Sequence, residues 1–199
     1  MRVGVFGGTF DPPHLGHLIL ASEALDQLHL DHLLWMVTAM PPHKFNGDVT
    51  PLEQRLALTH AAIQDFPQFE LSTLEIDRPG PHYAVDTVAL VKEQFPQADI
   101  FYLMGEDSLR DLPTWHEAEC FIRRCDGLGV MRRPGSEAAL NHLKAFYPAI
   151  LEKIHWFITP MVDISSHDIR IRIRDNRPYR FFLPEAVYQL INEKQYYQE

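Results

Sequence analysis

The chain opens with a short apolar strand, two adjacent glycines and a helix, and this order constrains the fold more than any other feature. Residues 3–6 are typical of a buried strand, and the apolar residues of 15–28 recur at helical spacing. The rest of the chain repeats this alternation. It predicts an α/β fold in which a mostly parallel sheet is covered by helices on both faces. Ligands of such sheets bind beyond the carboxyl ends of the strands.

The same apolar patterns place the remaining elements. We expect strands at residues 33–37, 69–72, 100–104, 128–131 and 154–158, and helices at about 52–63, 84–95, 117–124 and 139–146, from 166 and from 184. Thr50 and Glu53 form a capping-box pattern, with Pro51 at the first helical position, and Ser136 is a candidate cap for the helix at 139–146. Residues 169–174 alternate with a period of two, which suits a strand. The two serines before them indicate a helix start, and we predict a helix.

One domain is expected over residues 1–199. The chain is long enough for a single good core, and no repeat or Gly/Ser linker divides it. We expect the core to occupy about residues 1–160 and a C-terminal helical part to occupy about residues 161–199.

The charge and the cysteines narrow the class of protein. The net charge of −9 argues against broad electrostatic binding to nucleic acid or to anionic membranes. No apolar run is long enough to cross a bilayer, and the first residues lack the apolar core of a signal peptide. Cys120 and Cys125 are too few for a disulfide framework and are expected to be buried thiols. We therefore expect a cytoplasmic protein with no membrane and no nucleic-acid partner.

The loop after the first strand has the features of a phosphate-binding turn. Gly7 and Gly8 let the backbone approach an anion closely, and the next helix offers unpaired N–H groups at its start. The P-loop and GxGxxG fingerprints are both missing, which argues against P-loop enzymes and dinucleotide-binding dehydrogenases. His14 and His17 lie three residues apart, so both imidazoles can face phosphate oxygens. Two other readings stay open, namely histidines that only cap the helix and a zinc site that still lacks a third ligand.

Residues 7–17 read GGTFDPPHLGH, which resembles the GGTFDPxHxGH signature of the nucleotidyltransferase superfamily, and specifically of the bacterial nicotinate-nucleotide adenylyltransferases. Residues 42–44, 75–87, 105–115, 133–135 and 164–170 resemble further blocks of that family in the same order. The resemblance implies a Rossmann-like, doubly wound fold. It also implies transfer of AMP from ATP to nicotinate mononucleotide in NAD biosynthesis, which releases nicotinate adenine dinucleotide and pyrophosphate. Mg²⁺ would be bound mainly through the ATP phosphates.

The resemblance assigns residues to both substrates. The ATP site would comprise Gly7, Gly8, Thr9, Phe10, His14, His17, Gly105, Asp107, Ile164, Ser165, Ser166 and Arg170. The acceptor site would comprise Thr9, Lys44, Tyr83, Ala84, Thr87, Trp115 and Arg133. The catalytic residues would be His14, His17, Lys44 and Arg170.

The resemblance also gives these residues roles. The two histidines would stabilise the α-phosphate, whereas Lys44, the serine pair and Arg170 would hold the leaving pyrophosphate. Asp107 would accept hydrogen bonds from ribose hydroxyls, and Trp115 would stack on the nicotinate ring. Judged from the residues alone, Asp107 as a helix cap, Trp115 as a core residue, and Lys44 and Arg133 as surface residues stay open.

Two departures from the family pattern bear on the acceptor. His82, Tyr83 and Ala84 stand where the family has S-Y-T, so two hydroxyls that could contact the pyridine carboxylate are missing. His167 replaces a threonine of the serine block. The alternatives are an adenylyltransferase for nicotinamide mononucleotide or phosphopantetheine, and a nucleotide-binding regulator without turnover.

Overall fold

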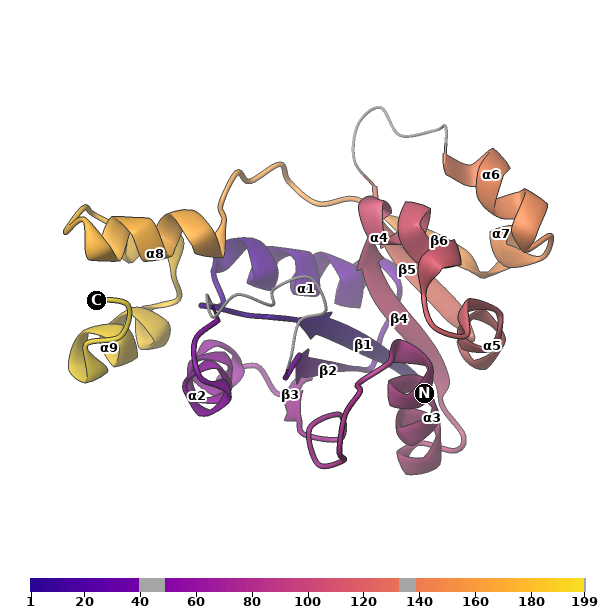
Figure 1. The fold of residues 1–199 in the computed structure, drawn as a ribbon, viewed down its shortest axis with the longest axis horizontal. Helices are drawn as coiled ribbons and strands as arrows, with labels where there is room; N and C mark the ends of the chain where they lie inside the picture. Colours follow the sequence, from indigo (N-terminus) through magenta and orange to yellow (C-terminus); the bar gives the residue numbers. More distant parts are fainter. Residues whose placement is uncertain (40–48, 133–138, 199) are drawn as a thin grey trace.

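The computed structural model describes residues 1–39, 49–132 and 139–198. Within these residues, six strands form one sheet in the order β3-β2-β1-β4-β5-β6, and every neighbouring pair is parallel (Figure 1). The strands are β1 (Arg2–Gly8), β2 (His32–Val37), β3 (Phe69–Ser72), β4 (Asp99–Gly105), β5 (Gly127–Met131) and β6 (Ile154–Phe157). Parallel pairing throughout confirms the predicted fold class.

The helices are α1 (Leu15–Gln27), α2 (Leu52–Ile63), α3 (Ala84–Gln94), α4 (Glu106–Asp111), α5 (Ala118–Arg124), α6 (Ala139–Phe146), α7 (Ile150–Lys153), α8 (Ser166–Arg174) and α9 (Glu185–Lys194). Two short 3₁₀ turns occupy Leu112–Thr114 and Arg180–Phe182. In the part of the chain that the structure describes, none of the helices is long and apolar enough to span a membrane.

Two apolar clusters cover the two faces of the sheet. Side chains of α1, α2, α8 and α9 build one cluster, and those of α3, α5, α6 and α7 build the other. Successive residues of β2 point to opposite faces, since Trp35 lies in the first cluster while Leu34 and Met36 lie in the second. A strand buried on both faces needs a continuous apolar run, and this run is why β2 could be predicted from the sequence.

The direction of winding changes between β1 and β4. From β1 the chain moves outward to β2 and β3, and it then returns to add β4, β5 and β6 on the other side. A crevice opens at such a switch point, beyond the carboxyl ends of the two central strands. The first loop, which we define as residues 7–13, begins with the last two residues of β1 at this edge, and Gly105 ends the neighbouring strand β4.

The sequence prediction about the helix start is confirmed at α8, whereas the capping predicted for α2 is wrong. The helix predicted after Ser165 is confirmed as α8. The capping box at Thr50 is wrong, because Pro51 is the N-cap of α2 and no side chain caps this helix. The Thr50 backbone bonds elsewhere, as its N–H donates to Asp11 and its carbonyl accepts from Arg55. Ser136 lies outside the described residues.

Candidate active site

The two glycines of the first loop allow two different side chains to approach the backbone closely. A Cβ built on Gly8 would lie 2.7 Å from Cζ of Phe10, so only glycine lets that ring pack under the strand end. Phe10 itself has a left-handed backbone, with φ of 47°, and its side chain is 2% exposed. A Cβ on Gly7 would lie 3.3 Å from the hydroxyl of Tyr102. A Cβ on Gly105 would meet nothing within 4 Å, which leaves space at the end of β4. The Phe10 ring is thus a core group, and only its backbone can reach a ligand.

His14 and His17 are brought together at the start of α1. Their rings are stacked, with centroids 3.7 Å apart and planes at 25°. The His14 N–H donates to Nδ1 of His17 at 3.1 Å. Neutral His17 therefore carries its proton on Nε2, and that N–H is its remaining donor. A Cβ on Gly16 would lie 3.1 Å from the His14 ring, so this glycine makes room for the stack.

Both imidazoles are neutral at pH 7 in the absence of ligand. Burial lowers the pKa of His14 to about 4. Burial, and then the charge of His14, lower the pKa of His17 well below its usual value. His14 and His17 form a capping-box arrangement at the start of α1, but among the described residues the buried Nδ1 of His14 has no partner within strict hydrogen-bond geometry. A phosphate placed beside this pair would supply the missing partner and favour protonation.

The depressed pKa of His14 predicts a loss of stability in mild acid. As the pH falls below 6.5, the unfolded chain takes up the proton first, so the free energy of unfolding falls between pH 6.5 and 4. From pH 7 to pH 5 the contribution of His14 is about 2 kcal/mol. Urea unfolding at pH 7 and at pH 5 measures how far the free energy of unfolding falls between them. This fall should be smaller in His14→Gln than in the wild type, by about the same 2 kcal/mol. An unchanged difference would mean that His14 titrates normally in the fold.

The serine block folds onto the first loop. Ser165 is the N-cap of α8, where its hydroxyl oxygen accepts from the N–H of Asp168 and its O–H donates to the Asp168 carboxylate. The hydroxyl of Ser166 donates to the carbonyl of Pro12 at 2.8 Å. Arg170 Nη1 donates to the backbone carbonyl of Asp11 at 2.7 Å. Segments more than 150 residues apart in sequence are thus joined at one edge of the sheet (Figure 1).

Asp11 connects the first loop to three other segments. Its side chain is 1% exposed, and Oδ2 accepts from the N–H of Thr50 at 3.2 Å and lies 3.7 Å from Arg170 Nη1. Its Oδ1 accepts from the hydroxyl of Tyr197, close to the C-terminus, at 2.9 Å. Asp11 stands in the first-loop motif but had no predicted role, and no sequence pattern pointed to Tyr197.

Two of the predicted acceptor residues, Tyr83 and Trp115, lie close together near the start of α3, because Tyr83 contacts His116, the residue after Trp115. Tyr83 precedes α3, and its ring stacks on that of His116 with the two ring centroids 4.0 Å apart. The ring of Trp115 is half-buried, at 5.3 Å from the ring of Phe121 and 6.0 Å from that of Tyr102. Trp115 therefore belongs in part to the core and keeps an exposed portion for a ligand.

Other predicted residues are less available for side-chain contacts. Thr87 is 1% exposed and its hydroxyl donates to Glu75, whose pKa is raised by burial. Asp107 lies in the first turn of α4, whose N-cap is Gly105, and it pairs with Arg110 at 3.2 Å. The alternative reading of Asp107 as the helix cap is therefore wrong, and its ribose contact stays a prediction.

Four other predicted site residues either pack in the fold or lie outside the described residues. Ile164 packs against the apolar cluster under α8, and Ala84 is the first residue of α3. Lys44 and Arg133 lie outside the described residues. Within the described ranges, 1–39, 49–132 and 139–198, no three His, Cys, Asp or Glu side chains gather as a metal-binding group.

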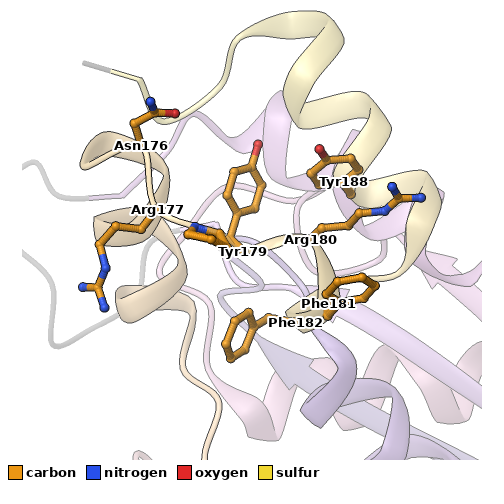
Figure 2. A pocket seen from close by; sticks show the side chains of 8 residues that line it. Asn176, Arg177, Tyr179, Arg180, Phe181, Phe182 and Tyr188 are labelled. Atoms are coloured by element: carbon orange, nitrogen blue, oxygen red, sulfur yellow. The ribbon is translucent and has the colours of Figure 1, made fainter.

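A cavity of about 370 Å³ lies between the end of α8 and α9, away from the first loop (Figure 2). Its lining is aromatic and basic: Asn176, Arg177, Pro178, Tyr179, Arg180, Phe181, Phe182 and Tyr188. Arg180 already forms an ion pair with Glu185 at 3.1 Å and lies over the Tyr188 ring. The charge of Arg180 is thus compensated within the protein.

Comparison with known proteins gives the family. Residues 5–172 match the family model described as cytidylyltransferase-like. The nicotinate-nucleotide adenylyltransferase of Bacillus subtilis is 36% identical over 197 residues, which cover 99% of this chain and 98% of that protein. A probable nicotinate-nucleotide adenylyltransferase of Thermomicrobium roseum is 41% identical over 190 residues, which cover 96% of this chain and 88% of that protein.

A solved structure has a similar fold. Plasmodium falciparum nicotinic acid mononucleotide adenylyltransferase complexed with NaAD matches with a TM-score of 0.78 at 17% identity, over 98% of this chain and 97% of that chain. At this identity the likeness concerns the fold alone. The family model and the full-length relatives go further, and they show that the chain belongs to the nicotinate-nucleotide adenylyltransferases, within the cytidylyltransferase-like family of nucleotidyltransferases.

Proposed function

We propose that this chain transfers the AMP unit of ATP to nicotinate mononucleotide, which gives nicotinate adenine dinucleotide and pyrophosphate in NAD biosynthesis. The observation that carries the proposal is the stacked, neutral pair His14 and His17 at the start of α1, beside the glycine turn at the switch point. Relatives that match over nearly their full length carry the name of this activity.

The reaction is a direct in-line displacement. An oxygen of the 5′-phosphate of the acceptor forms a bond to the α-phosphorus of ATP, and the bond from that phosphorus to the α,β-bridging oxygen breaks. Pyrophosphate leaves with the electron pair. The attacking phosphate is already an anion at neutral pH, because its second pKa is about 6, so no general base is needed. Positioning and charge stabilisation then supply the catalysis.

The two histidines stabilise the α-phosphate. Nε2–H of His17 is the donor left after its Nδ1 has accepted the His14 N–H. The N-terminus of α1 adds backbone N–H groups and the positive end of the helix dipole. Because both imidazoles are largely desolvated, their hydrogen bonds to a developing negative charge gain strength.

The start of α8 holds the leaving pyrophosphate. The hydroxyls of Ser165 and Ser166 already bond to Asp168 and Pro12, so the N–H groups of the first helical turn are the better donors. Arg170 adds positive charge while one of its nitrogens braces the first loop. Lys44 also acts on the pyrophosphate in this proposal, on the strength of the family resemblance alone.

The acceptor base binds where Trp115 and Tyr83 present aromatic faces. Tyr83 is the N-cap of α3, and its side chain makes no cap hydrogen bond, which leaves backbone N–H groups of the first turn for the pyridine carboxylate. The positive end of the helix dipole favours a carboxylate over an amide. Ala84 and Thr87 take part through the backbone and through packing.

The proposed cofactor is Mg²⁺, bound mainly through the phosphates of ATP. Mg²⁺ prefers phosphate, carboxylate and water oxygens in octahedral geometry. The residues placed at the phosphates, His14, His17, Ser166 and Arg170, are chiefly donors to oxygen, so they suit the phosphates rather than the cation. When bound, the ion neutralises charge on the leaving pyrophosphate.

Isotopic labelling tests the proposed bond changes. With ATP labelled at the α-phosphorus, nicotinate mononucleotide and Mg²⁺, the label should move into the dinucleotide, whereas label at the β-position should move into pyrophosphate. Release of α-labelled AMP without dinucleotide would contradict transfer and would indicate hydrolysis.

A further inference from the structure

Arg55 is a fully buried arginine on α2, and the proposed reaction gives it no role. It is 1% exposed and shares the buried face of α2 with Leu58, Thr59 and Ala62. An arginine buried among apolar side chains is costly unless its N–H groups and its charge are matched. Burial lowers the pKa of Arg55, while the negative charge of Asp11 raises it.

Four backbone carbonyls accept hydrogen bonds from Arg55. Nε donates to the carbonyl of Thr50 at 2.8 Å. Nη1 donates to Thr9 at 3.1 Å and to Thr38 at 2.8 Å, and Nη2 donates to Ala39 at 3.1 Å. A guanidinium has five N–H donors in a rigid plane, and these bonds use four of them.

The four carbonyls belong to three separate segments. Thr9 lies in the first loop, Thr38 and Ala39 follow β2, and Thr50 precedes α2. The N–H of Thr38 also donates to the carbonyl of Gly8 at 2.9 Å, so the first loop is tied to the end of β2 both directly and through Nη1 of Arg55. A single planar group thus fixes the relative positions of all three segments.

We infer that Arg55 is a positioning residue for nucleotidyl transfer, holding the first loop, and with it the pair His14 and His17, in register with β2 and α2. The inference rests on the proposed function. The link to the histidines runs through Phe10, the residue after Thr9, whose ring lies 5.1 Å from the ring of His17. Displacing a catalytic group by about 1 Å can cost on the order of 10²-fold in rate.

The chain offers a matched control for a purely structural clamp. Lys153 Nζ donates to three carbonyls, those of Ile122, Arg123 and Cys125, at the end of α5. Lys153 immediately precedes β6, so it lies at the amino end of the strands, opposite the first loop. Lys153→Met removes hydrogen bonds from one side chain to several carbonyls, as Arg55→Lys does, but without touching the candidate active site.

The decisive variant is Arg55→Lys, which keeps the positive charge beside Asp11 but cannot reach four carbonyls with one ammonium group. For variants shown by near-ultraviolet circular dichroism to be folded, we expect kcat of Arg55→Lys to fall by about 10- to 100-fold. We expect kcat of Lys153→Met to stay within about twofold of the wild-type value, even if its melting temperature falls as far as that of Arg55→Lys. Hydrogen exchange of the peptides that cover residues 8–12 and 36–39 should accelerate in Arg55→Lys only.

Each outcome decides between the inferences. Wild-type protein without transfer activity would overturn the proposed function, while accelerated exchange in Arg55→Lys would still establish the clamp. An active wild type with unchanged kcat in Arg55→Lys would overturn the positioning role. Should Arg55→Lys fail to fold, exchange in the wild type replaces it. The amide of Thr38, which donates to the carbonyl of Gly8, should then exchange only in the slowest opening step, and fast exchange of this amide would overturn the clamp.

Discussion

Replacing His17 by alanine is expected to lower kcat by about 10²–10³-fold, the scale for loss of one preorganised donor at a developing negative charge. His17 is oriented by three contacts with two neighbours, since it accepts the N–H of His14, stacks on that ring and packs edge-on against Phe10. Its Nε2–H therefore points in one direction before substrate arrives, and alanine offers no replacement donor. Initial rates of pyrophosphate release at saturating ATP and acceptor measure the effect.

His60→Ala is the matched control for this prediction. His60 lies on the exposed side of α2, in the last turn of that helix. Its removal should leave kcat within about twofold, as expected for a surface substitution away from the site. Normal turnover in His17→Ala, with the protein folded, would sink the assignment of His17 to the α-phosphate.

The second large effect is on stability. Asp11→Ala is expected to lower the free energy of unfolding by about 3–5 kcal/mol, the range for removing one partner of a buried charge pair. The carboxylate is 1% exposed, and its loss leaves the Thr50 N–H and the Tyr197 hydroxyl without their acceptor. It also leaves the buried Arg55 without the negative charge that raises its pKa. Urea unfolding at pH 7 measures the change.

Two further variants separate the contributions of this carboxylate. Tyr197→Phe removes only the hydroxyl that donates to Asp11 and should cost about 1.5–3 kcal/mol, as for a hydrogen bond to a charged group. Asp65→Ala, an exposed aspartate beyond α2, should change stability by less than about 0.5 kcal/mol. If Asp11→Ala were no more destabilising than Asp65→Ala, the buried network would contribute nothing to the fold.

Most of the fold could be predicted because its signals are local. A parallel strand buried on both faces needs a continuous apolar run, as in β2 and β4, and each of the six strands lies within two residues of its predicted bounds. The helix at the ambiguous residues 169–174 was predicted correctly from the serine pair before them and from the family resemblance, and Ser165 does cap α8. The capping box at Thr50 failed because the backbone of that residue is bound by the distant residues Asp11 and Arg55, which a local pattern cannot reveal.

The candidate site was predictable to the extent that its motifs are contiguous. The first loop and the serine block were found separately, and the structure brings them together through Ser166 and Arg170. Contacts between distant segments left weaker signals in the sequence. Arg55 interrupts the buried face of an amphipathic helix, which is the pattern that could have exposed it. Tyr197 follows the last helix and gave no comparable signal.

The central claim is that nicotinate mononucleotide is the acceptor, and a paired acceptor assay tests it most directly. With ATP and Mg²⁺, kcat/KM is measured for nicotinate mononucleotide and for nicotinamide mononucleotide by pyrophosphate release. A carboxylate at the N-terminus of α3 gains up to about 2 kcal/mol from the helix dipole, which an uncharged amide does not. The acid should therefore be preferred by about tenfold or more. Equal kcat/KM for the two mononucleotides, or a higher value for the amide, would contradict the account.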